Sequence, residues 1–190
     1  MSFCLWLTGL PGSGKSTISA ELEELLQESG MEAAVLSLDR IRKVVTPAPQ
    51  YTTEEREIVY RSLAVMAQLL VEEGHKNVII DATGNRRAFR DLARELIPDF
   101  AEIYVKCPLE TCESRETSRQ NQLVQKELYK RASEGKLNGK MPGVSAPYEA
   151  PLHPEVVVES DNLSPTESAQ KIMAYVRSRW LSQGKDVPKK

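Results

Sequence analysis

The 190-residue sequence has few cysteines and no strong excess of charge of either sign. Its three cysteines, Cys4, Cys107 and Cys112, are odd in number and lack the spacing of a disulfide framework, which predicts reduced thiols and a cytoplasmic protein. The 25 basic and 27 acidic residues give a net charge of −2, so no overall basic field would attract nucleic acid or a membrane surface. We therefore do not expect a nucleic acid partner, although a local basic groove would still allow one.

Long hydrophobic runs are also absent, and no apolar segment has the length that a bilayer requires. The apolar residues 3–7 have no basic residues before them and lead directly into a glycine-rich segment, so we expect a first strand rather than a signal peptide. The fractions of apolar residues (41%) and charged residues (27%) are those of an ordinary globular protein. The sequence thus predicts one domain with a full hydrophobic core.

The most informative segment matches the pattern G-x-x-x-x-G-K-[ST] at every fixed position. It reads Gly9-Leu10-Pro11-Gly12-Ser13-Gly14-Lys15-Ser16-Thr17. An expected strand precedes it, and apolar residues at helical spacing follow it, which is the arrangement of a phosphate-binding loop. A glycine-rich turn without a ligand is the weaker alternative, because both flanks also fit the motif.

The chemistry of this loop requires these residue types. Gly9, Gly12 and Gly14 lack a Cβ, so the backbone N–H groups can approach a polyphosphate, and the following helix N-terminus favours negative charge. Lys15 is expected to reach the β- and γ-phosphates and to be catalytic, and the hydroxyl of Ser16 is expected to bind Mg²⁺. We therefore expect ATP and Mg²⁺ as cofactors. The residues of this loop predicted to bind ATP are Gly9, Pro11, Gly12, Ser13, Gly14, Lys15, Ser16 and Thr17.

Strand and helix patterns alternate along the whole chain. Expected strands cover residues 3–7, 33–38, 77–81, 100–105 and 155–158, with helical patterns between them. Such alternation predicts a parallel sheet with helices on both faces, the three-layer α/β fold of phosphate-loop (P-loop) kinases. We expect a single domain over residues 1–182, a mobile basic lid at about 116–151 and a flexible tail at 183–190.

Asp39 follows the second expected strand, with Arg42 one helical turn later. Ligands of parallel sheets bind at the carboxyl ends of strands, so Asp39 is a candidate to accept a proton from an attacking hydroxyl or to hold Mg²⁺. Arg42 is a candidate to bind an anionic substrate. The structural alternative is an Asp39 that caps a helix and pairs with Arg42.

Asp81 ends the third expected strand, after three apolar residues. This pattern resembles a Walker B strand, so Asp81 is a candidate to hold Mg²⁺ or to position water in catalysis. Capping of the turn at residues 81–84 explains it equally well.

The lid region supplies further cations, of which Arg115, Arg119 and Lys126 are candidates to cover the transferred phosphoryl group. Of these, Arg115 and Arg119 are expected to bind ATP. A solvated helix face is the alternative reading for each single residue.

Several segments together resemble the adenylylsulfate (APS) kinase family over most of the chain. They are Trp6-Leu7-Thr8-Gly9-Leu10, Tyr51 with Glu54-Glu55-Arg56, Leu109-Glu110-Thr111-Cys112-Glu113-Ser114-Arg115, Leu128-Tyr129-Lys130-Arg131-Ala132, and Gly143-Val144-Ser145-Ala146-Pro147-Tyr148-Glu149-Ala150-Pro151. The resemblance implies that ATP and adenylylsulfate are converted to ADP and 3′-phosphoadenylylsulfate, and it implies a homodimer.

Residue by residue, the resemblance places five positions at the substrate. Asp39 and Arg42 match the Asp and Arg of a D-G-D-x-x-R motif, and Arg56 matches a substrate-contacting Arg. Lys126 matches a Lys near the phosphosulfate, and Met141 stands where the family has an aromatic ring stacked on the substrate adenine. The partner expected from this match is a small-molecule nucleotide.

The chain departs from the family pattern at the acceptor side and not in the ATP loop. Ser37 and Leu38 replace the first Asp and Gly of D-G-D, Val59 replaces a substrate-binding Asn, and residues 81–85 differ from the usual segment. A kinase of this fold acting on another nucleotide-type or polynucleotide hydroxyl therefore stays open. A GTPase switch would need an N-K-x-D sequence, which is absent. A catalytically silent nucleotide-binding protein is the third possibility.

Overall fold

The computed structural model describes residues 2–117, 128–135 and 141–181 of the chain. Arg119, Lys126 and the predicted tail at 183–190 lie outside these residues. The described strands form a five-stranded parallel sheet in the order β2-β3-β1-β4-β5. They are β1 (Cys4–Thr8), β2 (Ala33–Ser37), β3 (Asn77–Asp81), β4 (Phe100–Lys106) and β5 (Val156–Glu159).

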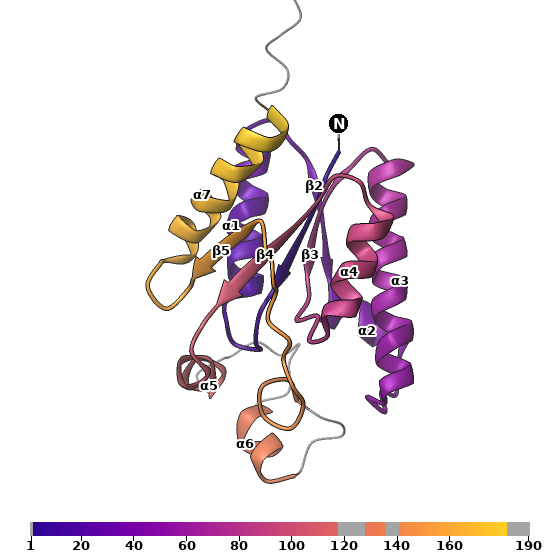
Figure 1. The fold of residues 1–190 in the computed structure, drawn as a ribbon, viewed down its shortest axis with the longest axis vertical. Coiled ribbons are helices and arrows are strands. Elements are labelled where there is room, and N and C mark those ends of the chain that lie inside the picture. The colour runs from indigo at the N-terminus through magenta and orange to yellow at the C-terminus, as the bar shows by residue number, and fades with distance from the viewer. Residues whose placement is uncertain (1, 118–127, 136–140, 182–190) are drawn as a thin grey trace, which may run out of the picture.

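Helices cover both faces of the sheet (Figure 1). The helices of the described residues are α1 (Lys15–Glu28), α2 (Leu38–Val45), α3 (Thr53–Glu72), α4 (Arg87–Leu96), α5 (Leu109–Thr117), α6 (Leu128–Ser133) and α7 (Pro165–Val176), which continues as a π-helical turn, η1 (Arg177–Leu181). Helices α1 and α7 lie on one face, and α3 and α4 lie on the other. The predicted three-layer α/β fold is confirmed.

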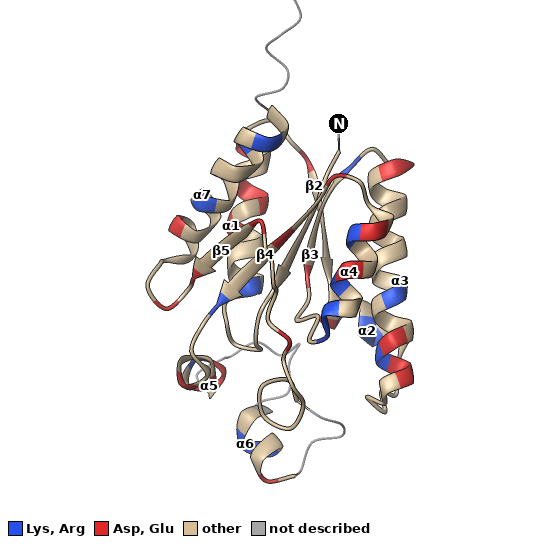
Figure 2. Ribbon diagram, in the orientation of Figure 1, with Lys and Arg blue, Asp and Glu red and all other residues tan. Residues whose placement is uncertain are grey.

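The side chains of β1 explain why the core has two halves. Successive strand residues point to opposite faces, so Leu5 and Leu7 pack with α1 and α7, whereas Cys4 and Trp6 pack with α3 and α4. All four are fully buried. Figure 2 shows the complementary pattern, with charged residues mainly on the helices and few on the strands.

The sequence places capping residues before two helices, Thr52 with Glu55 and Ser164 with Glu167, and both caps form in the structure. The Thr52 hydroxyl accepts a hydrogen bond from the Glu55 N–H at the start of α3. Ser164 and Glu167 form a reciprocal capping box at the start of α7, with Pro165 at the first helical position. Within the described residues, none of the helices combines the length and the apolar character needed to cross a membrane.

Two boundaries differ from the sequence prediction. The second strand ends at Ser37 and helix α2 begins at Leu38, where we expected the strand to include Leu38. Ser37 occupies the N-cap position and Asp39 lies in the first turn, where an acidic side chain is favourable. Glu155 precedes β5 instead of starting it.

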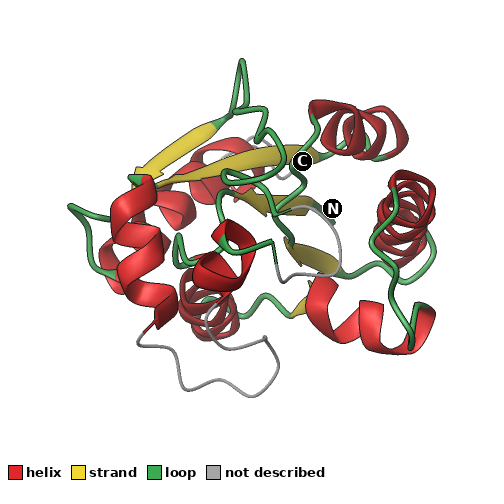
Figure 3. Cartoon of the chain, turned by 90° about the horizontal axis from the view of Figure 1, so that it is seen from below, coloured by secondary structure: helices red, strands yellow, loops and turns green. Residues whose placement is uncertain are grey.

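Parallel pairing brings the carboxyl ends of all five strands to one edge of the sheet. In Figure 1 the arrowheads point toward this lower edge, below which α5 and α6 lie, and Figure 3 looks onto it from below. The three predicted catalytic residues, Lys15, Asp39 and Asp81, lie after β1, after β2 and at the end of β3, and they therefore meet at this edge.

Candidate active site

The backbone of the phosphate-binding loop depends on its glycines, because a side chain there would strain the backbone or collide with neighbouring backbone atoms. Gly12 and Gly14 adopt φ angles of 80° and 98°, in the left-handed region, and Gly14 is the N-cap of α1. A Cβ on Gly12 would lie 2.4 Å from the carbonyl oxygen of Cys112, in α5. A Cβ on Gly9 would lie 2.4 Å from the carbonyl oxygen of Val105, in β4. The loop is thus packed closely against the elements that follow β3.

The first turn of α1 supplies the two side chains predicted to act on phosphate and metal. Lys15 is 8% exposed, and its ammonium donates hydrogen bonds to the carbonyl oxygens of Gly9 (3.0 Å) and Leu10 (2.9 Å). The Ser16 hydroxyl donates to the Asp81 carboxylate at 2.7 Å. The end of β3 is therefore in direct contact with the phosphate-binding loop.

A cavity of about 300 Å³ opens at the carboxyl edge of the sheet. Its lining residues are Pro11, Gly12, Gly14, Lys15, Ser16, Thr17, Leu38, Asp39, Asp81, Ala82, Thr83, Arg115 and Glu116. The three predicted catalytic residues, Lys15, Asp39 and Asp81, thus share one cavity. The sequence had left capping roles open for both acids. However, Ser37 occupies the N-cap position of α2, and the Gly84 N–H in the turn after Asp81 donates to the Tyr60 hydroxyl.

Arg42 and Arg56 meet on one aromatic ring, and neither is among the residues that line this cavity. Their guanidinium carbons lie 5.2 and 5.8 Å from the centre of the Tyr51 ring, which are cation–π distances. Arg42 also forms an ion pair with Glu55 at 3.4 Å. Burial lowers the pKa of Arg56, and the adjacent Arg42 cation acts in the same direction. Two neighbouring cations of this kind suit an anionic ligand.

Arg115 lines the cavity and also supports the phosphate-binding loop. Its guanidinium donates to the Ser160 hydroxyl (3.3 Å) and carbonyl oxygen (2.7 Å), and the Ser160 hydroxyl donates to the Ser13 carbonyl oxygen at 2.7 Å. This chain of bonds connects α5, the end of β5 and the loop. Arg115 therefore positions the loop from outside, a role that its place in the sequence did not reveal.

Met141 lies apart from the residues that line the cavity. It is 4% exposed and packs with Cys112 and Tyr129 in a small third core cluster. The stacking role implied for this position by the family resemblance stays a prediction.

Two tyrosines of the region predicted as a lid contact the phosphate-binding loop or its supporting strand, and sequence reasoning assigned neither a function. The Tyr129 hydroxyl donates to the Pro11 carbonyl oxygen at 2.7 Å, and the Tyr148 and Thr8 hydroxyls lie 3.0 Å apart. Both tyrosines belong to the segments that carry the family resemblance, which was the one available signal. Their bonding partners, more than a hundred residues away in the chain, were not visible there.

Comparison with known proteins agrees with this geometry. The family described as adenylylsulphate kinase matches residues 1–159. A probable adenylyl-sulfate kinase of Halalkalibacterium halodurans is 36% identical over 183 residues, covering 94% of this chain and 84% of the relative. The adenylyl-sulfate kinase of Thermodesulfovibrio yellowstonii is 36% identical over 181 residues, covering 94% of this chain and 85% of the relative.

A solved structure gives the same assignment. The APS kinase CysC of Mycobacterium tuberculosis, in complex with AMPPNP and APS, superposes with a TM-score of 0.80 at 30% identity. The match covers 93% of this chain and 98% of that one. On the strength of the family match, the relatives and the site itself, the chain belongs to the adenylylsulfate kinase family.

Proposed function

We propose that this chain transfers the γ-phosphate of ATP to the 3′-hydroxyl of adenylylsulfate, giving ADP and 3′-phosphoadenylylsulfate. The observation that carries the proposal is the meeting of Lys15, Ser16, Asp39 and Asp81 in one cavity at the phosphate-binding loop. Membership of the adenylylsulfate kinase family supports the choice of acceptor.

In the proposed reaction the 3′-oxygen bonds to the γ-phosphorus as the bond to the β,γ-bridging oxygen breaks, and ADP leaves. Asp39 lies in the first turn of α2 and takes the proton of the hydroxyl. Lys15 and the loop N–H groups balance the negative charge of the phosphates. Arg42 and Arg56 hold the anionic part of the acceptor, together with Lys126, and Arg119 binds ATP.

The site also fits Mg²⁺. The Ser16 hydroxyl and the Asp81 carboxylate are hard oxygen ligands within 2.7 Å of each other, and both line the cavity with Asp39. When bound, Mg²⁺ would supply positive charge to the β- and γ-phosphates. We assign Asp81 to the metal and Asp39 to the base, because Asp81 is the acid bonded to Ser16.

A kinase with a different nucleotide-type or polynucleotide acceptor is the second candidate, and one observation favours it. Val59 stands where the family has a substrate-binding Asn, and it is fully buried among apolar residues of the α3 and α4 core. It therefore offers no contact to a polar acceptor.

ADP release by the purified chain, measured with Mg²⁺, ATP and either adenylylsulfate or a panel of nucleotides and oligonucleotides, separates the two candidates. We expect turnover with adenylylsulfate and formation of 3′-phosphoadenylylsulfate by chromatography. Lys15→Ala should remove this turnover. Adenylylsulfate turnover no faster than the ATPase background would overturn the proposal, and a preferred panel member would identify the other acceptor.

We also propose a cytoplasmic homodimer. The family resemblance supports the dimer, and three free cysteines support a reducing compartment. Light scattering after size-exclusion chromatography measures the oligomeric state, and a monomer mass of 21.3 kDa would contradict the dimer.

A further inference from the structure

The turn that follows β3, residues 82–84, is held by buried side chains at successive carbonyl oxygens. The Trp6 indole N–H donates to the Ala82 carbonyl oxygen at 3.0 Å, and the Thr8 hydroxyl donates to the Thr83 carbonyl oxygen at 2.6 Å. Both donors are fully buried residues of β1. The strand that precedes the phosphate-binding loop therefore fixes the first two peptide units after Asp81.

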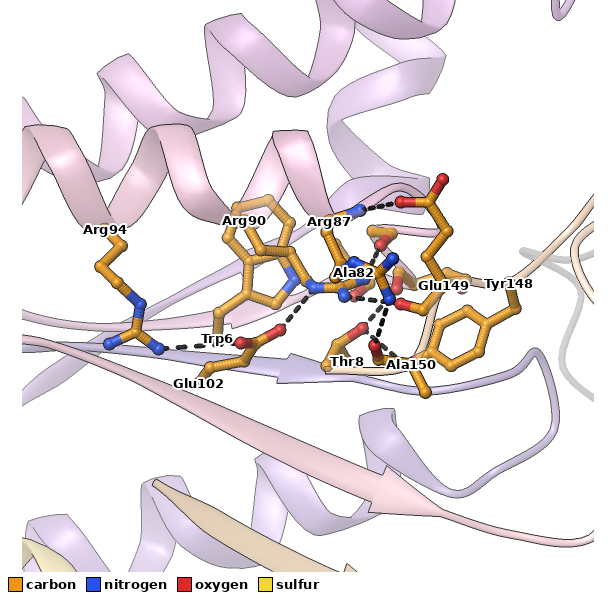
Figure 4. A network of polar contacts seen from close by, with 12 residues as sticks. Trp6, Thr8, Ala82, Arg87, Arg90, Arg94, Glu102, Tyr148, Glu149 and Ala150 are labelled. Carbon is orange, nitrogen blue, oxygen red and sulfur yellow. Dashed lines mark hydrogen bonds and ion pairs between the residues drawn. The ribbon is translucent and has the colours of Figure 1, made fainter. Parts of the chain in front are cut away.

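Arg90, in α4, holds the third carbonyl oxygen of the turn, that of Gly84. Its guanidinium donates to the Gly84 carbonyl oxygen and, at 2.6 Å, to the Glu149 carbonyl oxygen. The side chain is 1% exposed, and its Nε lies 2.5 Å from the carboxylate of Glu102, in β4. Figure 4 shows this single guanidinium between the turn, the segment at 148–150 and the carboxylate.

The segment around residues 148–150 is attached at further points. The Tyr148 and Thr8 hydroxyls are 3.0 Å apart. The Glu149 N–H donates to the Asn85 carbonyl oxygen at 2.8 Å, and the Glu149 carboxylate accepts a hydrogen bond from the Arg87 N–H at 2.8 Å (Figure 4). The turn and this segment thus form one bonded unit, with Arg90 buried between them.

This unit borders the candidate active site. Asp81 immediately precedes the turn, and Ala82 and Thr83 line the cavity beside Asp81. A buried cation is costly unless it is paired, and Glu102 supplies the opposite charge. Arg90 does not need its hydrogen bonds to the Gly84 and Glu149 carbonyl oxygens for charge neutralisation. These two bonds instead connect the turn at 82–84 to the segment at 148–150.

We propose that Arg90 is a positioning residue for phosphoryl transfer, which fixes the turn at 82–84 and with it Asp81 in the cavity. Arg90 itself is not among the residues that line the cavity. Its effect on rate follows because small displacements of catalytic groups lower the rate strongly. The kinetic readout of this proposal rests on the proposed function.

The experiment separates the carbonyl bonds from the charge pair. The Glu102→Gln variant keeps the guanidinium and its bonds, whereas the Arg90→Met, Glu102→Gln double variant removes the bonds and leaves no unpaired buried charge. We expect the double variant to fold and its kcat to fall at least about 10-fold below that of Glu102→Gln. The KM for ATP should stay within about twofold, because the contacts of the phosphate-binding loop are intact.

Arg94→Met is the matched control. Arg94 lies one helical turn after Arg90 and pairs with Glu102 and Glu155, but its ion pairs lie away from the turn. We expect lower thermal stability with kcat within about twofold of the unchanged chain. A folded double variant with the kcat of Glu102→Gln, or an equal loss of kcat in Arg94→Met, would overturn the proposal.

Hydrogen–deuterium exchange provides a readout that needs no substrate. Amides at residues 84–87 and 148–150 should exchange faster in the double variant than in Glu102→Gln, with α1 unchanged. Equal exchange would overturn the proposal even if the enzyme were active. Absence of adenylylsulfate turnover in the unchanged chain would instead count against the proposed function alone.

Discussion

The hydroxyl of Tyr129 donates a 2.7 Å hydrogen bond to the carbonyl oxygen of Pro11, 118 residues earlier in the chain. Tyr129 is 6% exposed and packs with Cys112 and Met141. Through this contact the short helix α6 reaches the loop expected to hold the nucleotide phosphates. The geometry of that loop therefore depends on residues from the second half of the sequence.

Removing this hydroxyl should weaken nucleotide binding. In Tyr129→Phe the Pro11 carbonyl loses its donor while the ring keeps its packing, a cost of about 1 kcal/mol. We expect ATP to bind several-fold more weakly, as measured by calorimetry. Tyr175→Phe, on α7 against Trp180, is the control and should bind ATP normally. Unchanged affinity in Tyr129→Phe would show that the contact does not shape the loop.

Adding a single methyl group at Gly12 should strongly weaken ATP binding. In Gly12→Ala the new Cβ meets the Cys112 carbonyl oxygen at 2.4 Å, and φ is 80°. We expect at least a tenfold loss of ATP affinity, because the loop must move away from α5. Gly30→Ala is a useful comparison, since φ there is 75° but no atom lies within 4 Å of the added carbon. It should lose about 1 kcal/mol of stability and no ATP affinity.

Substitutions of Asp39 and Asp81 should change different kinetic properties of the enzyme. Asp39→Asn removes the proposed base, so we expect kcat to fall at least about 100-fold with ATP affinity unchanged. Asp81→Asn should instead raise the Mg²⁺ concentration needed for half-maximal rate, because the Ser16–Asp81 pair is the proposed metal site. Steady-state assays over ATP and Mg²⁺ concentrations distinguish the two. An Asp39→Asn enzyme with normal kcat would exclude Asp39 as the base.

The pair between Arg94 and Glu155 should make stability depend on acidity. Burial alone would raise the pKa of Glu155, but hydrogen bonds from the Arg94 guanidinium, at 2.5 and 2.9 Å, and from the Glu102 N–H lower it below its ordinary value of 4.5. Because the folded-state pKa is depressed, the stabilisation is present above pH 4.5 and is lost as the pH falls through the folded value.

Glu155→Gln should therefore unfold more easily than the unchanged chain at pH 7, by about 1 kcal/mol, and the difference should shrink below pH 4.5. Urea titrations at several pH values measure it. Glu95→Gln, at an exposed position of the same region of α4, serves as the reference and should change little at any pH. A difference that stays constant with pH would contradict the assigned charge pair.

The fold and the nucleotide loop were predictable because their signals are local. The fixed positions at 9–17 and the apolar strand before them predict the loop, and the cap residues Thr52 and Ser164 predict two helix starts. The start of α2 at Leu38 was missed. The apolar run at 33–38 continues the strand pattern, whereas the chain turns into a helix one residue earlier.

The sequence by itself determined the glycine loop, Lys15, Ser16 and the alternation of strands and helices, since each depends on residues adjacent in the chain. Only the tertiary structure decided that Ser16 contacts Asp81, that Arg42 and Arg56 share the Tyr51 ring, and that Arg90 is buried between two segments. The physical reason is that these contacts are set by which strands pair and which helices cover them. A parallel sheet joins strand ends that lie dozens of residues apart, and no local pattern records which side chains then meet.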